Sequence, residues 1–266
     1  ERRLEGGLLD AIGVTASSYD SGESVTFFQS NLDGDVLPGW RQSRRRGVPT
    51  RLNVKHLLAS SAIPTILPAA KIGKSYYGDG ALRQVAPISS AIHLGAERIL
   101  VIGVSGNPNV APSDQHEQHS PSLARMVGHV FNSAFIDALE NDMEHVTRIN
   151  ELVGMVINEN PHAVTGTMKM VDFLCINPSI DISDLVARHI GNLPRSMRSL
   201  LKMTGATPSG GGASMASYLL FEAEFCKDLI SCGYRDAMEQ EGALMDFFHP
   251  RRELVMRGSA LSSSAY

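Results

Sequence analysis

One carboxylate in this sequence stands where it can do chemistry. Asp79 lies between Gly78 and Gly80 in the stretch SYYGDGALRQ. A carboxylate can act as a general base when a hydroxyl lies within hydrogen-bond reach. The two glycines remove side-chain bulk, so the backbone can turn with positive φ, and a substrate or second chain segment can approach closely. Because Asp-Gly is also a common turn dipeptide, these three residues alone favour a structural role.

A second group combines an aromatic ring with positive charge. In the stretch WRQSRRRG, Trp40 is followed by Arg41, Arg44, Arg45 and Arg46. Such a patch can meet anionic lipid headgroups, where each basic residue contributes about 1 kcal/mol near the charged surface. The alternative is a solvated loop, or arginines that are paired within the protein.

Metal and redox chemistry have little support. The stretch HEQH at residues 116–119 has metal-binding residue types, but its spacing is not HExxH and it lies in a Ser/Pro/Gln-rich loop. Asp33 and Asp35 are typical turn formers. The three cysteines form no CxxC pair, which is typical of buried thiols in a reducing compartment. We therefore expect neither a metal nor a cofactor.

The overall composition limits which classes of partner we expect. The chain has 266 residues, of which 43% are hydrophobic and 20% charged, and its net charge is −4. This charge provides no overall field that would attract nucleic acid. No apolar run approaches the roughly 20 residues of a membrane-spanning helix. The first ten residues, ERRLEGGLLD, contain no apolar stretch like that of a signal segment. We expect a cytoplasmic protein or one peripheral on the cytoplasmic face of a membrane. Because no initiator Met is present and strand-like sequence begins at once, we expect residue 1 to lie within a longer protein.

The pattern along the chain predicts an α/β fold. Two apolar runs, residues 8–16 and 24–29, flank a turn-rich stretch, as neighbouring strands do. A short helix is expected from an N-cap at Asn53, and another from Pro87 to about Gly95, before a buried parallel strand at 99–104.

Later segments are mainly helical. A long amphipathic helix is predicted over 123–156 and a strand over 171–176, with helices beyond. The expected organisation is an α/β half-domain at 1–110, a helical extension at 111–248 that packs on the same domain, and a flexible tail at 249–266.

A longer ordered pattern surrounds Asp79. The stretch His56–Ser105 resembles the second half of the patatin-like phospholipase domain, in which a helix ending in ASxAxP leads to a hairpin, a DG[GA] motif, a P…A…LGA helix and a buried strand. The matching residues are Ala59, Ser60, Ala62, Pro64, Tyr77, Asp79, Gly80, Ala81, Pro87, Ala91, Leu94, Gly95 and Ala96.

The resemblance implies both a fold and a reaction. It implies part of a three-layer α/β/α fold, with a parallel-rich sheet and an added helical C-terminal region. It also implies a lipid acyl hydrolase in which a Ser on a GxSxG elbow attacks an ester, such as a phospholipid. Asp79, followed by Gly80 and Ala81, would be the base of a Ser-Asp dyad that needs no cofactor.

The sequence departs from that family in two respects. No two of its 24 glycines are four positions apart, so GxSxG is absent, and so is the Gly-rich oxyanion loop expected early in the domain. Both elements would precede residue 1, and the nucleophile is unknown. Ser60 and Ser61 match the structural helix end instead. A non-catalytic scaffold or membrane-interaction module is therefore the alternative. A nucleotide-binding α/β protein finds no support in a GxGxxG or P-loop motif.

Overall fold

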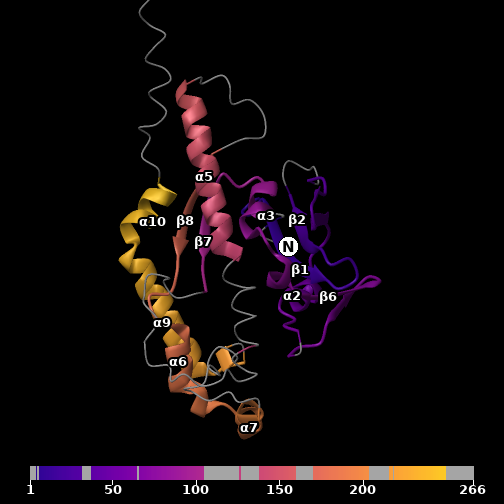
Figure 1. Cartoon of the computed structure of the whole chain (residues 1–266), viewed down its shortest axis with the longest axis vertical. Helices are drawn as coiled ribbons and strands as arrows, with labels where there is room; N and C mark the ends of the chain where they lie inside the picture. Colours follow the sequence, from indigo (N-terminus) through magenta and orange to yellow (C-terminus); the bar gives the residue numbers. More distant parts are fainter. Residues whose placement is uncertain are drawn as a thin grey trace, which may run out of the picture. The chain divides into compact units, whose positions relative to one another are not determined.

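The structure is a computed structural model. It describes residues 4, 6–31, 37–64, 66–104, 126, 138–159, 170–203, 216–217 and 219–249 (Figure 1). Two compact units divide the chain: residues 1–99 with 126–172, and residues 100–125 with 173–266. The predicted organisation into 1–110, 111–248 and a tail at 249–266 stays a prediction. Apart from residue 249, that tail lies outside the described residues.

The first unit contains a six-stranded sheet in the order β3-β4-β2-β1-β6-β5. The strands are β1 Ala11–Ser18, β2 Ser24–Ser30, β3 Arg41–Gln42, β4 Arg45–Pro49, β5 Ala70–Ile72 and β6 Ser75–Asp79. Only β2 and β4 pair in parallel, and every other pair in this sheet is antiparallel. The expected parallel-rich sheet is therefore wrong here. Short turns join β1 to β2, β3 to β4 and β5 to β6, whereas parallel neighbours need a long crossover.

A separate two-stranded sheet joins β7 Arg98–Ile102 to β8 Asp172–Ile176. The Asp172 amide donates to the Glu97 carbonyl at 3.0 Å, and the Gly103 amide donates to the Ile176 carbonyl at 2.9 Å. Since these bonds advance together along both strands, the pair is parallel. The predicted parallel strand at 99–104 exists, but it is not fully buried, because Ile102 is 75% exposed.

A short helix packs against one face of the sheet. Helix α2 Val54–Ser60 begins at Asn53, as predicted, and the Asn53 side chain accepts the Lys55 amide at 3.0 Å. In Figure 1, α2 lies beside β1 and β6 (indigo to violet). Between helix and sheet lies a core of Ala16, Val25, Phe27, Ala59 and Tyr77. This core holds β6 against its neighbour.

Helix α3 Pro87–His93 is capped at its N-terminus by a side chain from another helix. Its N-cap, Ala86, has no side chain to accept a bond, and the Ile88 amide donates to Asp142 on α5 Ala138–Glu159 at 2.8 Å. Burial raises the pKa of Asp142, although hydrogen bonds and Arg45 oppose this rise. The described part of the predicted helix 123–156 is confirmed as helical.

The second unit is mainly helical, as predicted for the C-terminal region. Its helices are α6 Ile182–His189, η3 Ile190–Asn192, α7 Arg195–Met203, α9 Ala223–Glu239 and α10 Glu241–Phe248. The core comprises Leu185, Val186, Leu193, Ala216, Leu220 and Phe225. The mixed α/β class is therefore confirmed. No helix in the described ranges has both the length and the apolar content needed to cross a bilayer.

A buried carboxylate anchors α9. Asp236 accepts the Ser179 hydroxyl at 2.6 Å, the Ser179 amide at 3.1 Å and the Cys232 thiol at 3.2 Å. Burial works to raise the pKa of Asp236, but these hydrogen bonds outweigh it and hold the pKa below its ordinary value. Asp236 therefore joins α9 to the turn that follows β8.

Candidate active site at Asp79

Asp79 is the last residue of β6, where three segments meet. It pairs with Ala16 in the middle of the sheet. Its amide donates to the Ala62 carbonyl at 2.9 Å, which ties it to the segment just after α2. The backbone of Asp79 is thus held by a neighbouring strand and by the helix end that carries the ASxAxP pattern.

The Asp79 carboxylate has two unlike oxygens. Oδ1 accepts the Ala81 amide at 3.0 Å and caps the short 3₁₀ helix η1 Gly80–Arg83. Oδ2 accepts no hydrogen bond from the residues that the structure describes. Burial raises the pKa of Asp79 above its ordinary value of 3.8, and the Ala81 hydrogen bond opposes that rise. One oxygen therefore orients the carboxylate while the other can accept a proton.

The flanking glycines serve close packing, and the expected positive φ is wrong. Positive φ occurs at Gly7, Gly22, Gly73 and Gly95, whereas Gly78 and Gly80 do not have it. A Cβ on Gly80 would meet the carbonyl oxygen of Thr15, and one on Gly78 would lie 2.5 Å from the Tyr19 hydroxyl. Asp79 can approach β1 this closely because both neighbours lack a side chain.

The structure adds hydroxyl groups that the sequence did not reveal. The buried Ser17 hydroxyl donates to the Gly80 carbonyl at 3.3 Å. Thr26 links Thr15 and Ser90 through hydroxyl contacts of 3.0 and 2.9 Å. These pairs are far apart in the chain, so no local spacing indicates them. The Ser17 bond supports the turn that follows Asp79, whereas the Thr26 contacts join β2 to β1 and α3. None of them involves the Asp79 carboxylate.

No nucleophile is found beside Asp79 in the described part of the chain. No Ser or Thr hydroxyl there is hydrogen-bonded to its carboxylate. Ser61, at the helix end, donates its hydroxyl to the Leu57 carbonyl at 3.0 Å. This bond closes the last turn of α2, in keeping with the structural role expected from the ASxAxP pattern.

Trp40 lies within an aromatic stack. Its ring stacks on Phe28 and on His93, with centroids 4.9 Å apart in each case. The His93 ring is in turn held by a 2.8 Å contact between Nδ1 and the Ser89 carbonyl. Trp40 thus packs the β2 face against α3.

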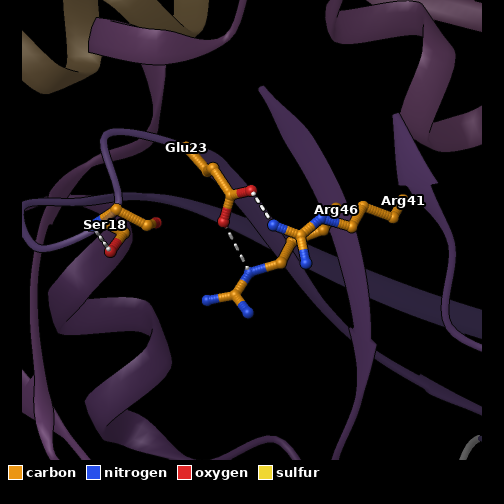
Figure 2. Close-up of polar contacts among 5 residues, drawn as sticks. Ser18, Glu23, Arg41 and Arg46 are labelled. Atoms are coloured by element: carbon orange, nitrogen blue, oxygen red, sulfur yellow. Dashed lines mark hydrogen bonds and ion pairs between the residues drawn. The ribbon is translucent and has the colours of Figure 1, made fainter. Parts of the chain in front are cut away.

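The arginines of the same stretch have different surroundings. Figure 2 shows Glu23 between two of them. Its Oε1 lies 3.0 Å from Arg41, and its Oε2 lies 3.3 Å from the Arg46 Nε, where the geometry is that of an ion pair without a hydrogen bond. Arg44 is exposed at the β3–β4 turn, with φ 57°. The structure therefore favours internal pairing for Arg46, and membrane contact through Trp40, Arg44, Arg45 and Arg46 stays a prediction.

Truncation of Trp40 tests these two roles. We expect Trp40→Ala to lower the free energy of unfolding by about 3 kcal/mol, because it removes the centre of a three-ring stack. Arg44→Ser is the matched change at an exposed position, and we expect it to leave stability nearly unchanged. Urea unfolding measures both. If Trp40→Ala left stability intact but abolished binding to anionic vesicles, the ring would serve a membrane.

No group of three or more His, Cys, Asp or Glu side chains in the described residues could hold a metal ion. The HEQH stretch at 116–119 lies outside those residues.

Comparison of this chain with protein-family models, curated proteins and solved structures found no match. The patatin-like resemblance therefore depends on the sequence pattern, chiefly on the ordered residues between His56 and Ser105.

Proposed function

We propose that this chain is part of a lipid acyl hydrolase of patatin type, with Asp79 as the base of a Ser-Asp dyad. The main support is the environment of the Asp79 carboxylate. One of its oxygens is fixed by the Ala81 amide, the other has no partner among the described residues, and burial raises its pKa. The substrate would be a phospholipid or another acyl ester. The proposed location is the cytoplasm or the cytoplasmic face of a membrane, where peripheral contact would bring the site to lipid.

The reaction follows from these two oxygens. An ordinary Asp has a pKa near 3.9 and is a weak base. Burial makes Asp79 more basic, so that Oδ2 can take the proton from a Ser hydroxyl as its oxygen attacks the ester carbonyl. The proton then passes to the leaving alcohol, which leaves an acyl-enzyme. A water molecule gives a proton to Asp79 as it attacks the acyl group, and that proton returns to the Ser. No cofactor is needed.

The nucleophile is proposed to lie upstream of Glu1, on a GxSxG elbow. The alternative is a non-catalytic patatin-like scaffold or membrane-interaction module. One observation favours it, namely that GxSxG does not occur among the 266 residues.

The encoded sequence upstream of Glu1 separates these functions. We expect a GxSxG motif within one domain length, about 100–200 residues. In that longer protein a fluorophosphonate should label the motif's Ser, and Ser→Ala should abolish the label. Absence of GxSxG, or a label that survives Ser→Ala, would leave the scaffold as the function.

A further inference from the structure

Helix α9 of the second unit has two unlike faces. On one face Phe225 and Leu229 pack in the helical core. Cys232 and Asp236 follow on the same face, where both are buried and hydrogen-bonded to each other. These four residues repeat at intervals of three or four, as one side of a helix does. This face therefore attaches α9 to its own unit.

The opposite face of α9 is apolar and exposed. Ile230, Tyr234 and Met238 follow one another at intervals of four residues and are exposed by 71, 70 and 46%. At 3.6 residues per turn, Tyr234 lies about 180° around the helix from the buried face. Single exposed apolar side chains are common, whereas a contiguous apolar patch is typical of a surface that binds a partner. We call these three residues the α9 stripe.

The α9 stripe has opposite charges at its two ends. Lys227 lies seven residues before Tyr234, and Glu241, the first residue of α10, lies seven residues after it. Both residues are exposed. Lys227 contacts Glu224 at 2.8 Å, but these two side chains are 69 and 66% exposed. Because solvent weakens so exposed a pair, Lys227 can exchange it for another carboxylate.

The order of these side chains is complementary to itself when reversed. In a two-fold symmetric contact, the same surface of both copies meets itself. If two α9 helices pack antiparallel with the axis at Tyr234, each residue lies opposite the one equally far beyond Tyr234. Ile230 of one copy then meets Met238 of the other, and Lys227 meets Glu241. A parallel pair would instead bring each charge against its own copy.

We propose that the α9 stripe is a homodimer interface, in which the α9 helices of two copies pack antiparallel around Tyr234. Burial of the apolar side chains drives the association. The charges at the two ends select the antiparallel direction, because like charges oppose the parallel one. The interface belongs to the second unit and does not depend on the function proposed for Asp79.

Charge reversal tests the interface in the 266-residue chain. We expect sedimentation equilibrium to give the mass of two chains. Lys227→Glu or Glu241→Lys alone should raise the dissociation constant of the dimer by about tenfold or more, because each change brings two like-charged pairs into the interface. The variant that carries both changes should regain the dimer. Rescue separates this effect from unfolding, because two destabilising changes in one chain would not restore the fold.

A matched control addresses the contact within α9. Glu224→Gln removes the charge that Lys227 contacts in its own helix but leaves the α9 stripe unchanged. We expect this variant to keep the dissociation constant of the starting chain. A loss equal to that of Lys227→Glu would show that the Glu224 contact, and not Glu241 of a second copy, explains the effect.

Cysteine cross-linking tests the register. Under mild oxidation, Tyr234→Cys should form a disulfide between the two copies of residue 234. Ile230→Cys should not cross-link to itself, because its two copies would lie about 12 Å apart along the helices, beyond the reach of a disulfide. A mixture of Ile230→Cys and Met238→Cys should cross-link. Peptide mass spectrometry separates these disulfides from any formed by the three native cysteines.

Each of three results would overturn the proposal. A chain that remains monomeric up to its solubility limit does not use the α9 stripe to bind a second copy. A dimer that neither single charge reversal weakens has its interface elsewhere. Failure of the doubly reversed variant to regain the dimer, or a disulfide between two copies of residue 230, would exclude the antiparallel arrangement around Tyr234.

Discussion

Asp79→Asn is expected to lower ester turnover by about 100-fold or more in the protein that contains the nucleophile, the scale on which general bases contribute. The Asn side-chain oxygen can still accept the Ala81 amide, so the turn should persist. The amide cannot take a proton from a hydroxyl. Turnover of a short-chain ester at saturating substrate measures the loss.

Asp142→Asn is the matched control. Asp142 is also a buried carboxylate whose pKa is raised by desolvation, and it caps α3 through the Ile88 amide at 2.8 Å. Its loss should leave turnover within a few-fold of the starting protein. Equal losses in both variants would point to general damage, and undiminished turnover in Asp79→Asn would remove Asp79 from the mechanism.

The pH dependence of Asp79 has opposite signs for activity and stability. Its folded pKa lies above the ordinary value of 3.8, because burial disfavours the charged form. Activity should therefore rise as pH increases through the folded pKa, since the base must be ionised. Stability should fall over the window from 3.8 up to that pKa, because the folded state binds the proton more tightly. Asp79→Asn should remove this stability change along with the activity.

Gly80→Ala should destabilise the turn by several times more than Gly78→Ala. The added Cβ on Gly80 would meet the Thr15 carbonyl oxygen and lie 2.8 Å from the carbonyl carbon, which are backbone atoms that cannot rotate away. Overpacking of this kind typically costs about 1–3 kcal/mol, and occasionally more. On Gly78 the new methyl would meet the end of the Tyr19 side chain, which can move. Urea unfolding of both variants gives the comparison.

A second measurement separates packing from conformation. Neither glycine has positive φ, so alanine is not excluded at either position by its backbone angles. If both variants lost the same free energy of unfolding, contact with Thr15 would not explain the presence of Gly80. A Tyr19→Phe background should relieve Gly78→Ala in part, because it removes the hydroxyl 2.5 Å from the new methyl but keeps the ring carbon at 2.9 Å. It should not relieve Gly80→Ala.

Local signals predicted local structure well. The Asn53 cap, the turn between β1 and β2 and the Asp79 turn each depend on residues that are close together in the chain. Strand direction was wrong for the main sheet because apolar patterning marks a strand but not its partner. The strand predicted at 99–104 does occur, as β7. It pairs with β8, and α5 lies between the two strands in the sequence.

The candidate site, too, was predicted only where its features depend on neighbouring residues in the sequence. The sequence indicated Asp79 and the need for small neighbours, but it assigned the glycines a backbone role that the structure replaces with close packing on β1. Trp40 was associated with the arginines beside it, whereas its ring partners are Phe28 and His93. The Ser17 hydroxyl bond to Gly80 joins β1 to the start of η1, 63 residues along the chain, so local spacing could not predict it.

Trp40 also gives the first unit an optical signal of its own. It is the single tryptophan of the sequence, and it lies in a stack within the first unit. Tryptophan fluorescence therefore follows the unfolding of the sheet that holds Asp79 and is silent about the helical second unit. Far-ultraviolet circular dichroism is dominated by helices, which occur in both units, so it follows the second unit as well as the first. Coincidence of the two transitions is the standard test of all-or-none unfolding, and this chain carries the reporters for that test without any label.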